Sequence, residues 1–409
     1  MNYALYQFGT DLLAPWQGLA HGLAPLLRPL HPLQPGAPLL RRASAALEVL
    51  SELRVTHKRP AFHLAPVRAG NALVAIEEEE VFATPFGRLL HLRKDSDLPQ
   101  PRVLVVAPMS GHFATLLRGT VQVLLQDHDV YITDWANARD VPLEAGRFDL
   151  DDCIEHIIRF LEEMGGEERA PTHVLAVCQP AVPVLAAVAV MAQARNRHQP
   201  RSMTLMAGPI DTRRNPTGVN RLAQSRPIEW FERSLIDTVP WRFAGHGRRV
   251  YPGTTQLSAF MSMNLHRHAR AFATQYENIA AGALAATEAH RRFYEEYFAV
   301  MDLTAEFYLQ TVRSAFQENE LPRGTMQWRG RKVRPEAIRR TALLTVEGEN
   351  DDICGIGQTM AALDLCSGIP VTMKRHHLQT GVGHYGVFNG RRWANEIYPV
   401  VREMIQTTN

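Results

Sequence analysis

Short, valine-rich apolar runs alternate with helical patterns between residues 102 and 209. Apolar runs of this length are typical of strands that are buried on both faces of a parallel sheet. The four runs are RVLVVAP (102–108), DVYITDW (129–135), HVLAVCQ (173–179) and MTLMAGP (203–209). Because strands that alternate with helices form parallel, doubly wound sheets, this segment predicts a core of the α/β class.

The alternation stops near residue 213 and resumes near residue 340. The intervening segment is mostly helical in pattern and rich in aromatic residues. RTALLTV (340–346) then predicts a strand, 359–367 a helix, 370–374 a further strand and 392–406 the last helix. We therefore predict a core in two parts, 71–212 and 336–409, interrupted by a helical lid at 213–335.

Residues 1–70 are predicted to form a helical N-terminal extension. Its first apolar positions follow helical spacing: Leu12, Leu13, Trp16, Leu19 and Leu23. Five prolines between residues 23 and 42 forbid one continuous helix, and a second helical pattern follows at about 43–53. The extension either packs on the core or lies on an apolar surface. The acidic run 77–80, within a strand-like segment at 72–94, indicates a solvated turn or a sheet edge.

Composition excludes several classes of protein. The 44 basic and 42 acidic residues give a net charge of +2, which offers no long-range attraction for nucleic acid. The longest apolar run, 181–192, is too short to span a bilayer, and the first residues lack a secretory pattern. Four cysteines in 409 residues are too few for a disulfide scaffold, so we expect a reducing cytoplasm and free thiols.

One of these thiols, Cys178, lies at a predicted strand end that leads directly into a helix. A nucleophile elbow has this placement, because its tight turn exposes the nucleophile in a strained backbone conformation. The positions two before and two after are Ala176 and Pro180, whereas the common form has glycine at both. Alanine is small, and proline is tolerated at a helix start. The alternative is a buried structural cysteine.

An acid and a base follow Cys178 along the chain. Asp351 comes three residues after a glycine beyond the strand at 340–346, where hydrolases of this kind hold a catalytic acid. Asp352 is one residue off this spacing, and an Asx turn or helix cap is the alternative role. His384 lies among glycines 33 residues beyond Asp351, whereas His376 and His377 suit solvated or packing roles better.

The order of the three residues along the chain is stronger evidence for a catalytic triad than any one of the residues alone. Cys178, Asp351 and His384 follow the nucleophile–acid–base order of the α/β-hydrolase fold. His384 would remove the thiol proton, and Asp351 would orient the imidazole. Asp211, which follows an earlier strand, is the alternative acid, and Cys354 is expected to be a small buried side chain.

Acyl transfer also needs donors for a developing oxyanion. In this fold one donor is the backbone N–H after the nucleophile, here Gln179, and the second comes from the loop after an earlier strand. That loop is 108–112, so we expect the N–H of Ser110 or Gly111 to serve, with His112 nearby as a substrate-binding residue. A plain strand–helix connection is the alternative reading of this loop.

Several long segments resemble the intracellular polyhydroxybutyrate (PHB) depolymerases of bacteria. They include VLVVAPMSGHFATLLRGTVQ, DVYITDWANARDVPL, VLAVCQPAVPVLAAV, TLMAGPIDTRRNPTGVN, LLTVEGENDDICGIGQT and GVGHYGVFNGRRW. The resemblance implies an α/β-hydrolase fold, with Cys178, Asp351 and His384 as the triad and no metal or organic cofactor. It implies that the partner is PHB polymer or oligomers at a storage granule surface in the cytoplasm. The chain departs from the expected pattern at VYPGTTQLSAFMSMN (250–264), within the predicted lid.

Two other functions remain open from the sequence. Polyhydroxyalkanoate synthases are similar cysteine proteins that transfer hydroxyacyl groups from coenzyme A, but their elbow is richer in glycine than AVCQP. A catalytically silent granule-binding protein would retain the three residues without activity. The product formed from polymer and from hydroxyacyl coenzyme A distinguishes these possibilities.

Overall fold

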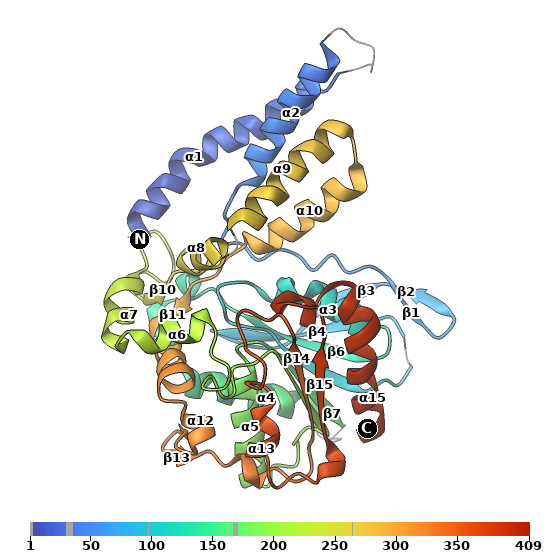
Figure 1. The fold of residues 1–409 in the computed structure, drawn as a ribbon, viewed down its shortest axis with the longest axis vertical. Helices are drawn as coiled ribbons and strands as arrows, with labels where there is room; N and C mark the ends of the chain where they lie inside the picture. The colour runs from blue at the N-terminus through green and yellow to red at the C-terminus, as the bar shows by residue number, and fades with distance from the viewer. Residues whose placement is uncertain (1–2, 30–35, 97, 167–170, 264) are drawn as a thin grey trace.

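The computed structural model describes residues 3–29, 36–96, 98–166, 171–263 and 265–409. A central sheet with helices on both faces forms the body of the molecule, and a group of helices projects from one side of it (Figure 1). Within these described ranges, no helix is both long and apolar enough to cross a bilayer.

The central sheet has eight strands in the order β15-β14-β8-β7-β5-β6-β4-β3. Six of them run parallel, and β4 and β3 add an antiparallel edge. The strands are β3 (Ile76–Thr84), β4 (Gly87–Lys94), β5 (Arg102–Val106), β6 (Asp129–Trp135), β7 (Thr172–Val177), β8 (Ser202–Met206), β14 (Ala342–Gly348) and β15 (Lys374–Gln379). The predicted mostly parallel, doubly wound sheet is confirmed.

The two faces of the sheet carry two cores. Along β5, Val103 and Val105 belong to one apolar cluster, and Leu104 and Val106 belong to the other. This alternation is the two-residue period of a strand, and burial on both faces explains why the run is continuously apolar. The cluster with Leu104 and Val106 includes side chains of α4 (Leu150–Gly165) and α5 (Ala181–Gln193). The cluster with Val103 and Val105 includes side chains of α3 (Arg118–Leu124) and α15 (Tyr398–Thr408).

The strand order reverses between β5 and β7. From β5 the chain passes to β6 on one side and then to β7 on the other side. Loops at such a switch point separate at the carboxyl ends of the strands, and ligands of open α/β sheets bind there. The loop after β5 and the turn after β7 therefore flank the expected position of a site.

Of two sequence predictions for the margins of the sheet, one is confirmed and one is wrong. The acidic run 77–80 lies in β3, the edge strand, so the predicted sheet edge is confirmed. The strand predicted at 370–374 is wrong in position, because a 3-10 turn occupies Val371–Met373 and β15 begins at Lys374. Pro370 has a fixed φ of about −60° and no N–H, and it begins this turn instead of pairing in the ladder.

Residues 213–335 are mostly helical, as their pattern predicted. The helices are α6 (Gly218–Ser225), α7 (Ile228–Leu235), α8 (Gly253–Met263), α9 (Leu265–Ala281), α10 (Leu284–Tyr297), α11 (Ala305–Thr311) and α12 (Glu320–Arg323). The sequence did not predict the short strands β9 (Asp237–Thr238), β10 (Arg249–Tyr251) and β11 (Leu303–Thr304), which form a small antiparallel sheet. Strands of two or three residues are too short to show a periodicity.

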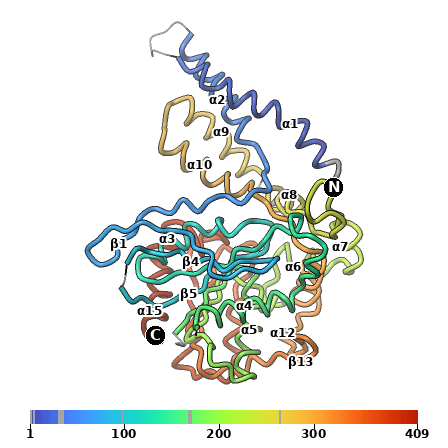
Figure 2. Tube along the Cα trace, turned by 180° about the vertical axis from the view of Figure 1, so that it is seen from behind, coloured from blue at the N-terminus to red at the C-terminus, as the bar shows by residue number. Residues whose placement is uncertain are grey.

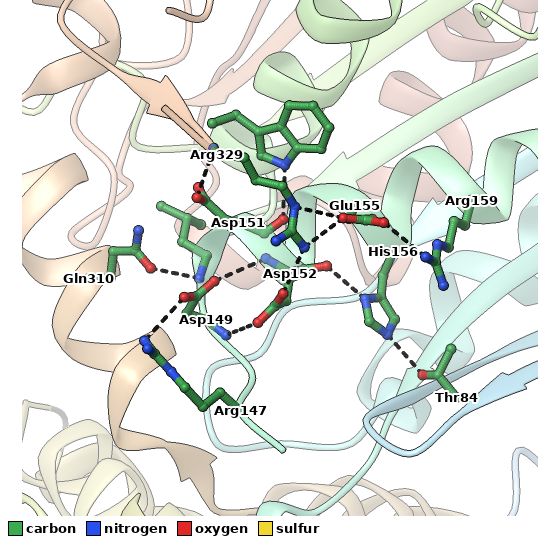
Figure 3. A network of polar contacts seen from close by, with 12 residues as sticks. Thr84, Arg147, Asp149, Asp151, Asp152, Glu155, His156, Arg159, Gln310 and Arg329 are labelled. Carbon is green, nitrogen blue, oxygen red and sulfur yellow. Dashed lines mark hydrogen bonds and ion pairs between the residues drawn. The ribbon is translucent and has the colours of Figure 1, made fainter. Parts of the chain in front are cut away.

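A polar network at the start of α4 fastens this segment to the core (Figure 3). The Asp149 carboxylate accepts the Asp152 N–H, and the Asp152 carboxylate accepts the Asp149 N–H, which forms a capping box. Gln310 of α11 accepts the N–H of the first helical residue at 2.9 Å. Arg329, in the turn between β12 (Gln327–Trp328) and β13 (Arg331–Lys332), pairs with Asp152 and Glu155. The N-terminus of α4 thus joins two distant parts of the chain.

The N-terminal residues form two helices, α1 (Tyr3–Leu23) and α2 (Ala37–Glu52). Helix α2 packs beside α9 and α10, and α1 packs against α2, away from the sheet (Figures 1 and 2). The predicted break between the helices is confirmed where α1 ends just before Pro25, whereas Pro32 and Pro35 lie outside the described residues. The division of the chain into units at residues 70, 212 and 335 stays a prediction.

The remaining elements complete the core. The hairpin of β1 (Val67–Ala69) and β2 (Ala72–Val74) precedes the sheet. The second part of the core contains α13 (Ala361–Leu365), α14 (Gly390–Arg392) and a π-helical turn at Trp393–Ile397 that continues into α15. The helices predicted at 359–367 and 392–406 are therefore confirmed in kind, with shifted ends.

Candidate active site

Cys178 occupies a strained turn between β7 and α5. Its φ is +68°, a left-handed conformation that side chains rarely adopt. The turn is held at both ends, because the Cys178 N–H donates to the Met206 carbonyl at 2.8 Å and the Ala181 N–H donates to the Cys178 carbonyl at 3.1 Å. Pro180 follows with φ −62° and starts the helix without losing a hydrogen bond. The turn has the geometry of a nucleophile elbow.

The four cysteines differ in their environment. Cys153, Cys354 and Cys366 are buried, and Cys178 is the partly exposed one. Burial raises the pKa of Cys153 and Cys354 far above that of a free thiol, and it raises the pKa of Cys366 to about 12. Those three thiols stay protonated and inert, so the alternative of a buried structural cysteine describes them and not Cys178.

The elbow sequence lacks the usual glycines, and a glycine that follows the neighbouring strand β8 leaves the space that the turn needs. Gly208 follows β8, and a Cβ added there would lie 2.1 Å from the Ala181 Cβ and 3.1 Å from the Cys178 carbonyl oxygen. The absence of a side chain at Gly208 therefore makes room for a turn whose own flanking residues are Ala176 and Pro180. The sequence reasoning missed Gly208, although it stands directly after a predicted strand.

Asp351 lies in the loop after β14, and its two carboxylate oxygens have different tasks. Oδ1 accepts the N–H groups of Ile353 at 2.9 Å and Cys354 at 2.8 Å, which closes a turn of the Asx type. Oδ2 accepts from Nδ1 of His384 at 2.8 Å. The Asx-turn role and the contact with the histidine thus coexist in one side chain, which is 0% exposed.

His384 connects Asp351 to Cys178. Its side chain is 5% exposed, and its Nδ1 is used by Asp351, which leaves Nε2 for the thiol. Burial alone would lower the pKa of His384, but the negative charges of Cys178 and Asp351 and hydrogen bonds with both raise it well above its usual value. The arrangement therefore places a histidine base beside the thiol, where it can remove the thiol proton as the sulfur attacks.

The alternative residues have other partners. Asp211 pairs with Arg213 at 2.7 Å and with Arg214 at 3.6 Å, and within the described residues it has no contact with a histidine. Asp352 is exposed. His376 hydrogen-bonds with Thr345, and His377 hydrogen-bonds with Gln379. The structure therefore brings together Cys178, Asp351 and His384 and none of these alternatives.

The loop 108–112 lies beside the elbow, as expected for the neighbouring strands β5 and β7. The Met109 N–H donates to Oε1 of Gln179 at 3.3 Å, so the Gln179 side chain ties the loop to the elbow. In the part of the chain described, the backbone N–H groups of Gln179, Ser110 and Gly111 have no hydrogen-bond acceptor. The sequence predicted the N–H of Gln179 and that of Ser110 or Gly111 as donors to an oxyanion, and this role stays a prediction. The sequence reasoning missed the role of the Gln179 side chain.

His112 ties the loop to the lid region. It is 1% exposed, and its Nε2 lies 3.1 Å from the Tyr297 carbonyl. Its ring stacks on Phe260 and lies tilted against the ring of Tyr297. Burial lowers its pKa to about 4, so the ring is neutral at neutral pH. Its predicted contact with substrate stays a prediction.

Helix α8 lies directly against the same loop. Gly111 has φ +84°, and a Cβ on it would lie 2.9 Å from the Gln256 side chain. The segment 250–264, in which the chain departs from the expected family pattern, therefore contacts the loop. Among the described residues, no group of three or more His, Cys, Asp or Glu side chains is arranged to hold a metal ion.

Several solved structures are similar to the chain at low sequence identity. Solved structures that superimpose on the chain include a monoglyceride lipase variant of Saccharomyces cerevisiae (TM-score 0.48, 10% identity, 84% of this chain and 99% of that chain). Others are a meta-cleavage product hydrolase of Pseudomonas fluorescens (0.45, 16%, 82% and 99%) and mouse alpha/beta hydrolase domain-containing protein 10 (0.45, 9%, 83% and 100%). The chain has the α/β-hydrolase fold.

A family model matches the second part of the chain. Residues 207–409, about half of the chain, match the family model described as PHB de-polymerase C-terminus. Through this region the chain is similar to the PHB depolymerases, and the resemblance stated from the sequence is confirmed there. No curated protein sequence matches the chain. The family and the fold together support ester hydrolysis as the general activity.

Proposed function

We propose that the protein hydrolyses the ester bonds of amorphous intracellular PHB to 3-hydroxybutyrate or short oligomers, through an acyl-Cys178 intermediate. The proposal places the protein in the cytoplasm, at the surface of the storage granule. The observation that carries it is the contact chain from Asp351 through His384 to a thiol on a strained turn, within a chain that matches a PHB depolymerase family model.

In the first half-reaction the Cys178 sulfur attacks the ester carbonyl carbon, and His384 takes the thiol proton on Nε2. The carbonyl oxygen becomes an oxyanion, for which the backbone N–H of Gln179 and that of Ser110 or Gly111 are available donors. The C–O bond then breaks, and His384 gives the proton to the alkoxide oxygen of the leaving polymer end, which departs as a hydroxyl group.

The second half-reaction releases the acyl group. A water molecule gives a proton to His384 and attacks the thioester carbonyl, and the thiolate leaves as Cys178 regains its proton from the imidazolium. Asp351 keeps Nδ1 of His384 protonated throughout and stabilises the cation. The products are a carboxylic acid and the thiol, so the mechanism needs neither a metal nor an organic cofactor.

The test compares two substrates and two variants. We expect the wild-type enzyme to release 3-hydroxybutyrate or oligomers from amorphous PHB particles and to form no polymer from 3-hydroxybutyryl coenzyme A. Cys178→Ala is expected to abolish release while particle binding persists, and Cys366→Ala is the matched control with full activity. Polymer growth from the thioester without release of soluble acid would instead identify a synthase. Activity of Cys178→Ala equal to that of wild type would remove Cys178 as nucleophile.

A further inference from the structure

The outer face of α1 is apolar and exposed to solvent. Its large side chains are Phe8, Leu12, Trp16, Leu19 and Leu23, which are 67%, 59%, 64%, 53% and 41% exposed. At about 100° per residue these five positions fall within an arc of roughly 80°, so they form one continuous stripe, which we call the α1 stripe. Contiguous exposed apolar surface of this kind marks an interaction site.

The other side of α1 is held in place by the rest of the molecule. The Tyr3 N–H donates to Asp237 at 2.6 Å, and the Tyr3 hydroxyl donates to Asp302 at 2.7 Å. Further along, Gln17 donates to the Leu53 carbonyl at 2.8 Å, and Ala20 is buried. The helix is therefore anchored at its start and along its length, and the α1 stripe is presented on a fixed support.

The α1 stripe carries no charge. Helix α1 contains no lysine or arginine, and its one carboxylate, Asp11, pairs with Arg242 at 2.8 Å. Helices that lie on membranes place lysine and arginine on the polar face, where these residues attract anionic lipid headgroups. A lipid surface would find no such partner on α1.

A second copy of the chain is also a poor occupant. A helix of 21 residues is about 32 Å long and about 10 Å wide, so one face offers a footprint of roughly 300 Å². Each partner in a stable dimer usually contributes about 800 Å². An extended surface that binds many molecules independently does not need a large interface with each one.

We propose that the α1 stripe docks the enzyme onto the uncharged surface of an aliphatic polyester particle, an inference that rests on the proposed function. The repeat unit of such a polymer has methyl, methylene and ester groups and no formal charge, which complements an uncharged apolar stripe. Helix α1 stands with α2, α9 and α10 on the side of the molecule where α8 lies (Figure 1), and α8 covers the loop beside Cys178. Docking through α1 therefore brings the lid side toward the polymer.

The test replaces the centre of the stripe with polar residues that fit a helix. Leu12→Gln, Trp16→Gln and Leu19→Gln are combined in the full-length chain. The matched control combines Leu143→Gln, Leu222→Gln and Val371→Gln, which change exposed apolar residues elsewhere. Co-sedimentation with amorphous PHB particles, release of 3-hydroxybutyrate at limiting particle concentration and turnover of p-nitrophenyl butyrate are measured for both and for wild type.

For the α1 variant we expect particle binding and polymer hydrolysis to fall about tenfold or more, with turnover of the small ester within about twofold of wild type. The control is expected to match wild type in all three. Unchanged particle binding in the α1 variant overturns the docking role while leaving the proposed function intact. Failure of wild type to hydrolyse either substrate overturns the proposed function instead.

Two further measurements address the other occupants. Binding of wild type to phosphatidylcholine or phosphatidylglycerol vesicles as tight as to PHB, lost in the α1 variant, would assign the stripe to lipid and refute the proposal. A wild-type dimer by light scattering that the α1 variant converts to a monomer would assign it to a second copy of the chain. A monomer that prefers PHB to both vesicles supports the polyester surface.

Discussion

Replacement of Asp351 by asparagine tests the most specific feature of the site, the division of tasks between two oxygens. Oδ1 accepts two backbone N–H groups at 2.9 and 2.8 Å, and Oδ2 accepts from His384. In the variant, the amide oxygen stays in the backbone turn, because the flipped amide would point its NH₂ at two N–H donors. Two unsatisfied buried donors cost about 1–3 kcal/mol each. The NH₂ group therefore faces Nδ1 of His384.

This orientation forces the wrong tautomer on the imidazole. Nδ1 of His384 must then accept from the amide, so the ring proton moves to Nε2, where the proton of Cys178 has to arrive. The carboxylate charge that helps to raise the pKa of His384 is lost as well. A thiol needs its base less than a hydroxyl does, so we expect kcat to fall about 10³-fold, which corresponds to about 4 kcal/mol.

The assay measures initial rates on amorphous PHB particles and on a soluble ester, together with the melting temperature. Because the backbone turn is retained, we expect Asp351→Asn to fold with near-normal stability. Asp211→Asn is the control, since it removes ion pairs with partly exposed arginines that contribute about 0–1 kcal/mol each, and it is expected to keep activity within about threefold. If Asp351→Asn retains more than about a tenth of kcat, or if Asp211→Asn loses more than Asp351→Asn, the reasoning is refuted.

Two other positions give predictions of different kinds. Gly208→Ala places a Cβ 2.1 Å from that of Ala181 and is expected to displace the Cys178 turn. We expect kcat to fall about 100-fold and the free energy of unfolding to fall by about 1–3 kcal/mol, measured by initial rates and urea unfolding. Gly218→Ala is the control, because a Cβ there has no atom within 4 Å, and it is expected to behave as wild type in both measurements. Burial raises the pKa of Asp302 from its usual 3.8 to about 6, so the folded state holds this proton more tightly than the unfolded state, and stability is present at low pH and lost as pH rises toward 6. We expect Asp302→Asn to remove this loss of about 3 kcal/mol, measured as urea unfolding between pH 4 and pH 7; an equally steep pH dependence in the variant would contradict the assignment.

The sequence by itself determined the class of fold and the members of the candidate site. Continuous apolar runs on β5, β7, β8 and β14 reflect burial on both faces, and this requirement acts on each residue wherever its strand lies. Chain order singled out Cys178, Asp351 and His384, because their positions after strands are a local property. The start of β15 was misplaced for a local reason, the turn that begins at Pro370.

The tertiary structure decided how those residues work. That Gly208 makes room for the Cys178 turn, and that the Gln179 side chain holds the loop of Met109, depends on which strands are neighbours in the sheet. Only the folded structure shows that the two carboxylate oxygens of Asp351 have different partners, the Ile353 N–H for Oδ1 and His384 for Oδ2. Spacing in the sequence does not specify such contacts, because they join residues whose separation along the chain is unrelated to their separation in space.

The same distinction applies to α1. The helical spacing of Leu12, Trp16 and Leu19 was readable from the sequence, but it predicted only that these side chains share a face. An apolar stripe usually turns inward, and the sequence left open whether this one packs on the core. Anchoring of the opposite side by Tyr3 and Gln17 decided that the stripe faces solvent. Which face of a helix is buried depends on what the rest of the chain places beside it, and only the folded molecule contains that information.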